Sequence, residues 1–497
     1  MSMLIGDIVR RQADRIPDRI YQVFGNKKYS FKDINLSANK FANALLASGI
    51  SPGDHIGIFS FTCIEYIIIY WGAAKAGVVL AHFNARLTDA ELANLIKHSD
   101  IKLLIFNQDL GQTVRKAKSL SGNRGNITYV SIGPKAGLRT QALDDMLASG
   151  DTAEPDAKND SLIITENSPF TMIYTSGTTG APKGVLLSHK QRLSVGMQHA
   201  LLAKGLFNRL LSAMPPFHHA GQGYTMVAPA LLGYTCYQFA HLDTDLFLKT
   251  IEREKITAIC LVPTSIKKLV ESPLLDRADL SSLQLILYGA EPILPEVLQA
   301  LRKVCPNAQV RQTYGQTEMG VVITLDNESH QVRPQSIGRA NIFSDVRILG
   351  DDGQEVQRGQ TGEIVIKNPS LMTGYYKDPE ATREFFKAGK DWGCTGDLGF
   401  MDKEAFITLA GRKKDMYISG GENVYPLEIE HTICRHPHVA EAAVIGIPHH
   451  KWGEVGMACV VTKPNVEITE NDLIRYCQKR LARYKCPKYV KFYNALP

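Results

Sequence analysis

Short runs of β-branched and aromatic residues alternate with helix-like patterns through roughly the first four hundred residues of this chain. The runs are HIGIFSF (55–61), LLIFN (103–107), ITYVSI (127–132), FTMIYT (170–175), AICLVP (258–263) and LQLILYG (283–289). A strand followed by a helix, repeated many times, predicts parallel sheets covered by helices. Because a chain of 497 residues buries more than one core, we expect two or more domains.

The pattern changes between residues 346 and 410, where short strands alternate with turn residues. This texture is typical of a small antiparallel or barrel-like unit. The segment after GRKKD (411–415) predicts a compact α/β module. Its expected elements are a loop at 419–421, a helix from Pro426, strands 441–447 and 456–462, and a helix 470–482. The sequence therefore predicts an α/β fold, with a large N-terminal domain of parallel-sheet subdomains and the barrel-like unit over residues 1–411, and a small α+β C-terminal domain over residues 412–497.

Composition excludes several classes of protein. The net charge of +6 comes from basic residues scattered among nearly as many acids, which argues against nucleic acid as a partner. The nine cysteines contain no C-x-x-C pair, so we expect reduced thiols in a cytoplasmic protein. The apolar segment 63–83 carries Glu65 and Lys75, so we expect a buried helix and strand there and no transmembrane segment. The first residues read as an amphipathic helix ended by Pro17, without an export signal.

The string YTSGTTGAPKG (174–184) places glycines, hydroxyls and Lys183 between two extended segments. Glycine leaves backbone N–H groups free to converge on anionic oxygens, and a lysine adds charge, so the string predicts a phosphate-binding loop. It does not match G-x-x-x-x-G-K-[ST], which disfavours a P-loop NTPase. The alternative is a flexible surface turn. Ser188 is expected to be the N-cap of the helix that follows.

The whole string resembles the nucleotide signature of the adenylate-forming superfamily, which contains acyl-CoA and aryl-CoA synthetases, peptide-synthetase adenylation domains and firefly-type luciferases. Further motifs follow in the order of that superfamily: YGAEP (288–292), QTYGQTE (312–318), CTGDLG (394–399) and GRKKD (411–415). The resemblance implies an AMP-binding domain over residues 1–411 and a mobile C-terminal domain over 412–497, with Lys414 at the hinge.

The resemblance also assigns site residues. The nucleotide would contact Thr175, Ser176, Gly177, Thr178, Thr179, Gly180, Lys183, Gly289, Ala290, Glu291, Pro292, Gln312, Thr313, Tyr314, Gly315, Gln316, Thr317, Asp397 and Arg412. The acid and coenzyme A would contact His218, Gln222, Gly223, Tyr224, Gly289, Gly315, Gly420, Gly421 and Glu422. Magnesium prefers carboxylate and phosphate oxygens, so Glu318 with Thr175 is the expected metal site. Lys183, His218, Glu318 and the hinge residue Lys414 are the expected catalytic set.

The resemblance implies a two-step reaction with ATP, Mg²⁺ and coenzyme A. A carboxylate attacks the α-phosphorus of ATP and releases pyrophosphate, and a thiol then attacks the acyl-adenylate and expels AMP. Related chains continue with a basic, glycine-containing segment whose lysine serves adenylation. This sequence stops at Pro497, so slower adenylation is expected from the chain as written, and a truncated chain or omitted tail is favoured over a natural enzyme without the lysine.

The acid and the acceptor stay open at this stage. The FHHAG stretch resembles CoA ligases, and His218 stands where amino-acid-activating domains place an aspartate, so an amino-acid substrate is disfavoured. We expect a medium- or long-chain fatty acyl-CoA synthetase. The alternatives are an aryl-CoA ligase, an acyl-AMP ligase that loads an acyl carrier protein, and a catalytically silent nucleotide-binding protein. The sequence leaves the oligomeric state open.

Overall fold

The computed structural model describes residues 3–122, 127–134, 140–155, 164–175, 182–203, 205, 208–291 and 293–496. The chain forms two compact units. Unit 1 consists of Met1–Pro334, Ala340–Asp345 and Lys367–Gly393, and unit 2 consists of Gln335–Arg339, Val346–Ile366 and Cys394–Pro497. The described residues contain no helix long and apolar enough to cross a membrane.

One sheet of unit 1 has the strand order β19-β9-β8-β4-β3-β5-β6-β7. Its strands are β3 (His55–Phe59), β4 (Val79–Phe83), β5 (Ile101–Asn107), β6 (Thr128–Ile132), β7 (Gln141–Ala142), β8 (Pro169–Thr175), β9 (Lys183–Ser188) and β19 (Gly374–Tyr375). The central strands pair in parallel, whereas β9 pairs antiparallel with both β8 and β19. The antiparallel edge brings segments that are distant in sequence beside the strand that begins at Lys183.

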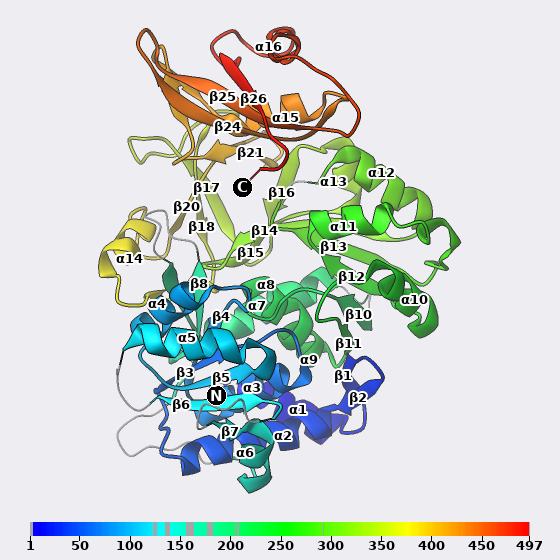
Figure 1. Ribbon diagram of the computed structural model, residues 1–497, viewed down its shortest axis with the longest axis vertical. Helices are drawn as coiled ribbons and strands as arrows, with labels where there is room; N and C mark the ends of the chain where they lie inside the picture. The colour runs from blue at the N-terminus through cyan, green and yellow to red at the C-terminus, as the bar shows by residue number, and fades with distance from the viewer. Residues whose placement is uncertain are drawn as a thin grey trace. The chain divides into compact units, whose positions relative to one another are not determined.

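Helices cover both faces of this sheet (Figure 1). They are α1 (Gly6–Arg15), α2 (Phe31–Ala47), α3 (Ile64–Ala76), α4 (Asp89–Ser99), α5 (Gly111–Ser121) and α6 (Leu143–Ser149). Successive residues of a strand point to opposite faces. Leu104 therefore packs with α4 and α5, and Ile105 packs with α2 and α3. The expected helix and strand within 63–83 are confirmed as α3 and β4.

The second set of unit 1 strands has the order β15-β14-β13-β12-β10-β11-β1-β2. These are β1 (Ile20–Phe24), β2 (Lys27–Ser30), β10 (Arg209–Ser212), β11 (Thr235–Gln238), β12 (Ala258–Leu261), β13 (Leu285–Gly289), β14 (Gln309–Gln316) and β15 (Gly320–Leu325). The helices of this part are α7 (His189–Ala203), α8 (His219–Gln222), the π-helical turn η2 (Gly223–Val227), α9 (Ala228–Leu232), α10 (Thr244–Glu254), α11 (Pro263–Val270), α12 (Pro295–Val304) and α13 (Asn327–Val332). Parallel pairing from β1 through β14, apart from β2, confirms the predicted sheet type.

Unit 2 begins with strands in the order β17-β18-β20-β21-β16. Their bounds are β16 (Ser336–Ala340), β17 (Asp345–Leu349), β18 (Gly362–Lys367), β20 (Gly393–Met401) and β21 (Ile407–Arg412). Strand β21 pairs antiparallel with both β20 and β16, which confirms the antiparallel texture expected between residues 346 and 410.

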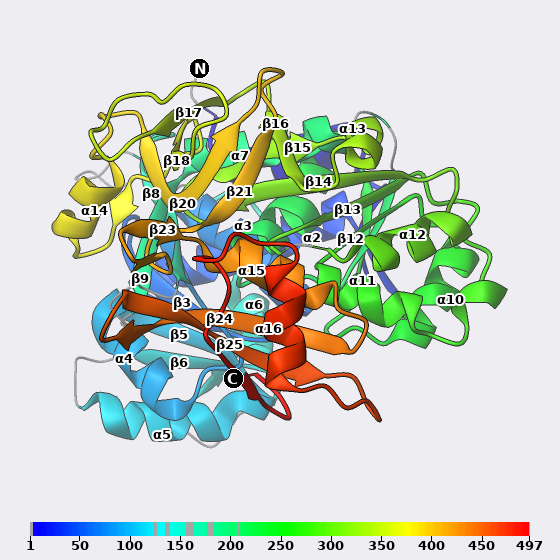
Figure 2. The ribbon, with the colours of Figure 1, turned by 90° about the horizontal axis from the view of Figure 1, so that it is seen from above.

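The rest of unit 2 is the α/β module. It contains β22 (Tyr417–Ser419), β23 (Glu422–Val424), α15 (Pro426–Cys434), β24 (Val439–His449), β25 (Gly453–Thr462), α16 (Glu470–Gln478) and β26 (Tyr489–Phe492). Helix α16 lies across β24 and β25 (Figure 2). It ends at Gln478 rather than at the expected residue 482, because the chain tightens there into a turn in which the Arg480 N–H donates to the Cys477 carbonyl at 2.9 Å.

Candidate active site

The predicted phosphate loop is flanked by two paired strands. In the register of β8 and β9, Thr175 lies directly opposite Lys183. Directly opposed side chains of an antiparallel pair project from the same face, so the side chains of Thr175 and Lys183 leave the two strands on one side. The prediction that two extended segments flank the loop is confirmed. The loop residues Ser176, Gly177, Thr178, Thr179 and Gly180 lie outside the described residues.

Glu318, the predicted metal ligand, lies just after β14 and is 9% exposed. Its Oε1 accepts a hydrogen bond of 2.9 Å from the Tyr375 hydroxyl. Its backbone carbonyl accepts a second hydrogen bond of 2.7 Å from the Met372 N–H. Both donors belong to the segment that ends in β19, so this segment fixes the glutamate through its backbone and its side chain.

The ring of Tyr375 also meets Lys183. The lysine Nζ lies 5.0 Å from the ring centroid, within the range of a cation–π contact. Thus one tyrosine contacts two predicted site residues, Lys183 and Glu318. Sequence reasoning missed Tyr375, and the only signal in the sequence was a Gly-Tyr pair in a turn-rich segment.

YGAEP lies at the carboxyl end of a parallel strand, as predicted. Strand β13 ends at Gly289, and Ala290 has a φ of +74°. A Cβ at Gly289 would overlap the backbone of Thr313 on the neighbouring strand β14, so this position requires glycine. The Glu291 carboxylate accepts a hydrogen bond of 3.1 Å from the Thr264 hydroxyl near the start of α11. Pro292 lies outside the described residues.

The residues of QTYGQTE line the end of β14 and the turn into β15. Gln312 Oε1 accepts a hydrogen bond of 3.1 Å from Tyr288, and the Thr313 hydroxyl donates to the Tyr288 carbonyl at 3.2 Å. A Cβ at Gly315 would overlap the Gly320 carbonyl across the turn. The remaining predicted residues here are Tyr314 and Gln316 on β14 and Thr317 in the turn.

The predicted acid-binding residues surround α8 and η2. His218 immediately precedes α8 and is exposed as a residue, although its imidazole is partly desolvated by the protein around it. The surrounding protein and the Arg86 guanidinium lower the pKa of His218, so the imidazole is neutral at physiological pH. Gln222 and Tyr224 are buried, and the Tyr224 hydroxyl donates to Thr313 at 3.3 Å. A hydrogen bond therefore connects this segment to β14.

Gly223 allows a close approach between η2 and α7. A Cβ at this position would overlap the ring of His199, and that ring stacks on Tyr224 at 3.8 Å between centroids. π-Helical turns are frequent at functional sites. The glycine is thus explained by packing, and its predicted role in binding an acid stays a prediction.

A fully buried arginine contacts His219, the residue after His218. Arg192 of α7 is 0% exposed, and its Nη1 donates to His219 Nδ1 at 3.3 Å. The geometry places the remaining ring proton of His219 on Nε2, because an arginine only donates. Burial, and then Arg192, keep the pKa of His219 well below its ordinary value. Sequence reasoning did not identify this arginine.

Asp397 and Arg412 meet within unit 2. They are directly opposed on β20 and β21, and Arg412 Nε lies 3.1 Å from Asp397 Oδ1. The neighbouring Lys413 pairs with Glu363 at 3.1 Å. Lys414 is exposed in the turn that follows β21. Its hinge role stays a prediction, as does the assignment of Asp397 and Arg412 to the nucleotide bound by Lys183.

The loop expected at 419–421 is the turn of a tight β-hairpin, and the residues after it continue as strand β23 (Glu422–Val424). Gly420 and Gly421 have φ values of +61° and +88° and connect β22 to β23, and Glu422 is the first residue of β23. Two consecutive positive φ values suit a two-residue hairpin turn, which explains why glycine occupies both positions. The Gly420 N–H donates to the Trp452 carbonyl at 2.8 Å.

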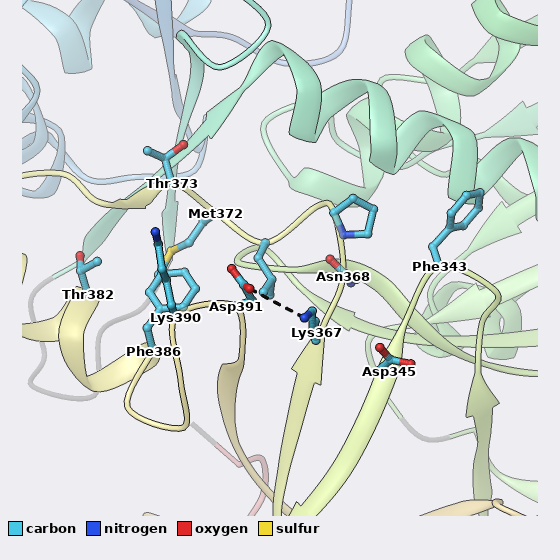
Figure 3. Close-up of a pocket in the computed structure, with 12 residues that line it drawn as sticks. Phe343, Asp345, Lys367, Asn368, Met372, Thr373, Thr382, Phe386, Lys390 and Asp391 are labelled. Carbon is cyan, nitrogen blue, oxygen red and sulfur yellow. Dashed lines mark ion pairs between the residues drawn. The ribbon is translucent and has the colours of Figure 1, made fainter.

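An open cavity of about 620 Å³ lies in unit 1 beside the segment that carries Tyr375 (Figure 3). Met372, Thr373 and Phe386 line it, and Lys367 pairs with Asp391 at 3.7 Å across its wall. The predicted site residues are absent from the described lining. The cavity therefore adjoins the candidate site without forming part of it.

Comparison with known proteins identifies the family. The model for AMP-binding enzymes matches residues 9–376, and the model for the AMP-binding enzyme C-terminal domain matches residues 428–497. The chain therefore belongs to the AMP-binding enzymes of the adenylate-forming superfamily. Within it the chain is an acyl-CoA synthetase, an AMP-forming acid–thiol ligase, which confirms the resemblance seen in the sequence. The predicted domain boundary at residues 411/412 falls between the two matches and stays a prediction.

Several relatives match over nearly the whole chain. Long-chain-fatty-acid–CoA ligase FadD13 of Mycobacterium tuberculosis is 34% identical over 475 residues, covering 95% of this chain and 90% of that protein. Feruloyl-CoA synthase of an Amycolatopsis species is 32% identical over 490 residues, covering 98% and 94%. The solved structure of a Mycobacterium tuberculosis fatty acyl CoA synthetase superposes with a TM-score of 0.79 at 31% identity, covering 99% and 95% of the two chains.

Proposed function

We propose that this protein is an ATP-dependent carboxylate–CoA ligase acting on a medium- or long-chain fatty acid. The acid and ATP form acyl-AMP and pyrophosphate, and acyl-AMP and coenzyme A then form the acyl-CoA thioester and AMP. The observation that carries the proposal is the convergence of Lys183 and Glu318 on Tyr375 beside the hydroxyl- and glycine-rich loop. This cluster unites a cation for phosphate with a carboxylate for magnesium.

The residues present fit a magnesium ion that is shared with ATP. The described residues contain no group of three or more histidine, cysteine or acidic side chains that could hold a metal. Magnesium is commonly held by one or two carboxylates together with substrate phosphates, and Glu318 with Thr175 meets that requirement. When bound, Mg²⁺ supplies charge neutralisation at the phosphate oxygens.

In the first step, Lys183 holds phosphate oxygens and Asp397 with Arg412 holds the ribose. A carboxylate oxygen of the acid forms a bond to the α-phosphorus, and the bond to pyrophosphate breaks. Fixed donors lower the cost of the charge that develops on the phosphoryl oxygens. His218 orients the carboxylate as a neutral donor, because its lowered pKa keeps it uncharged at physiological pH.

In the second step, the thiolate of coenzyme A forms the thioester bond and AMP leaves with the oxygen that joined it to the acyl group. The turn at Gly420 and Gly421 leaves backbone open for the approach of the pantetheine arm, with Glu422 beside it. A rotation about Lys414 would exchange the two half-reactions in one site, since a few backbone dihedrals are sufficient for a hinge.

The fatty acid is favoured by the first relatives described above, while the feruloyl-CoA synthase keeps an aryl acid as the second candidate. The buried aromatic and histidine side chains around η2, including His199 stacked on Tyr224, favour a flat acyl group and therefore support the aryl acid as the second candidate. We also propose a cytoplasmic location. An acyl carrier protein is the alternative acceptor.

The full-length protein tests the proposal with a panel of acids that contains octanoate, palmitate, ferulate and indoleacetate. Pyrophosphate release and thioester formation are measured with coenzyme A and, separately, with a holo-acyl carrier protein. The proposal predicts the highest kcat/KM with a fatty acid and with coenzyme A. A higher kcat/KM with ferulate would instead identify an aryl-CoA ligase. Thioester formation with the carrier protein and not with coenzyme A would identify a ligase that loads an acyl carrier protein.

A further inference from the structure

Tyr375 has no assigned role in the reaction, although it touches both predicted phosphate-site groups. Its hydroxyl donates to Glu318 Oε1 at 2.9 Å, and its ring lies under the Lys183 ammonium at 5.0 Å. We propose that Tyr375 is a positioning residue. It holds the Glu318 carboxylate and the Lys183 ammonium at positions from which both can bind the same magnesium-bound triphosphate. The inference rests on the proposed function and adds a residue to it.

Tyr375 is itself held from three directions. Its backbone pairs with Val185 of β9, two residues after Lys183. Its N–H donates to the Thr382 hydroxyl at 2.9 Å. Its ring meets the edge of Phe385 in α14 (Pro379–Phe385), with 6.3 Å between centroids and planes at 82°. These three contacts fix the position of the Tyr375 ring, so the ring can in turn fix the positions of Lys183 and Glu318.

The hydroxyl provides what the carboxylate needs. Glu318 is nearly inaccessible to water, and a buried carboxylate is stabilised by donors with fixed geometry. A tyrosine hydroxyl is protonated at physiological pH, so it donates to the carboxylate. Groups that orient metal ligands typically change metal affinity by one or two orders of magnitude when they are removed.

The next residue is a matched control. The Tyr376 hydroxyl donates to Asp100 Oδ2 at 2.7 Å, which is also a tyrosine–carboxylate hydrogen bond. Asp100 in addition pairs with Lys377 at 2.6 Å. The predicted site residues are absent from these contacts. Tyr376→Phe therefore removes the same atom from the adjacent position without touching Lys183 or Glu318.

The experiment compares the wild-type protein, Tyr375→Phe, Tyr376→Phe, Glu318→Gln and the double variant Tyr375→Phe/Glu318→Gln. Binding of Mg²⁺ in the presence of a non-hydrolysable ATP analogue is measured by calorimetry, and the Mg²⁺ dependence of acid-dependent pyrophosphate release is measured in parallel. Thermal unfolding reports whether each variant is folded.

We expect Tyr375→Phe to weaken Mg²⁺ binding about tenfold and Tyr376→Phe to leave it within about twofold. The tyrosine substitution should have little further effect on Mg²⁺ binding in the Glu318→Gln background, because the carboxylate that Tyr375 is proposed to position is already replaced by a neutral amide. If Tyr375→Phe does not fold, Tyr375→His keeps a ring and a donor and is expected to bind Mg²⁺ more tightly than Tyr375→Leu. Equal Mg²⁺ affinity in Tyr375→Phe and Tyr376→Phe, or in the His and Leu variants, overturns the inference. A wild-type protein that binds Mg²⁺ and nucleotide without releasing pyrophosphate overturns the proposed function instead.

Discussion

Arg412 Nε lies 3.1 Å from Asp397 Oδ1 across the directly opposed positions of β20 and β21. The carboxylate is 9% exposed and the guanidinium is 53% exposed, so the acid is fixed while the arginine reaches solvent. The Asp397 N–H donates to the Thr395 hydroxyl at 2.9 Å, which restrains the backbone from which the carboxylate extends. This arrangement suits a pair that presents oxygen and nitrogen groups to a ligand.

Substitution of Asp397 by Asn tests that assignment. A salt bridge with one exposed partner contributes little to folding, so the free energy of unfolding should fall by no more than about 1 kcal/mol. Replacing the charged carboxylate acceptor of the ribose hydroxyls by a neutral amide should raise the KM for ATP about tenfold, as expected when a hydrogen bond to a charged group is weakened. Steady-state kinetics and urea denaturation measure the two quantities. A large loss of stability with an unchanged KM would assign the pair to folding.

Lys183→Ala removes one charged phosphate contact. The loss is worth about 2 kcal/mol, or roughly thirtyfold in kcat/KM for ATP. Lys190→Ala is the matched control, because Lys190 of the following helix α7 is exposed and pairs with Glu166 at 3.6 Å. Acid-dependent pyrophosphate release at varied ATP provides the measurement. An equal, small effect in both variants would contradict the phosphate role of Lys183.

Most of the helices and strands could be predicted from the sequence, because hydrophobic periodicity and helix capping depend on residues that are close in sequence. The helix after β9 starts where expected, and the Ser188 hydroxyl accepts a hydrogen bond of 3.3 Å from the Gln191 N–H. The contact between Glu318 and Tyr375 could not be predicted in this way. The two residues are separated by 57 positions, and periodicity identifies an element without identifying which distant segment packs on it.

The same limit applies to the interior of the acid-binding region. A single arginine in an amphipathic helix reads as a surface residue, whereas Arg192 is fully buried and donates to His219. Strand β26 was not expected either, and its place is defined by parallel pairing with β25, which is a long-range interaction. The sequence therefore predicted most helices, strands and motifs, whereas the contacts between distant residues became known only from the structure.

Buried histidines predict a loss of stability in acid. His189 is 0% exposed, and burial lowers the pKa of its ring to about 4. Because an exposed histidine titrates near pH 6.5, the unfolded chain binds a proton that the folded chain does not bind between these values. Protonation of His189 therefore leaves the free energy of unfolding nearly unchanged above about pH 6.5. It lowers that free energy as the pH drops towards 4, by about 2 kcal/mol at pH 5.

His189→Gln tests this prediction, since glutamine keeps an acceptor for the Ile5 N–H, which lies 3.3 Å from His189 Nδ1. Urea denaturation at about pH 7 and pH 5 should show a smaller pH dependence in the variant, by about 2 kcal/mol. Equal pH dependence in the two proteins would show that His189 does not titrate on unfolding.

The hinge assignment predicts an unequal effect on the two half-reactions. Lys414→Pro stiffens the backbone at the exposed turn after β21, whereas Lys414→Ala removes only the side chain. The proline variant should slow one half-reaction at least tenfold more than the other, and the alanine variant should affect both by a similar factor. ATP–pyrophosphate exchange reports the first half-reaction, and thioester formation from supplied acyl-AMP reports the second. Equal effects of proline on both would place the hinge elsewhere.

The central claim is that the carboxylate of the acid attacks the α-phosphorus of ATP. The most direct test supplies a fatty acid labelled with ¹⁸O in its carboxylate, together with ATP, Mg²⁺ and coenzyme A, and analyses the products by mass spectrometry. The account predicts one ¹⁸O atom in the phosphate of each AMP released with acyl-CoA, because the bridging oxygen leaves with AMP. Label in inorganic phosphate, or AMP that carries no label, would contradict it.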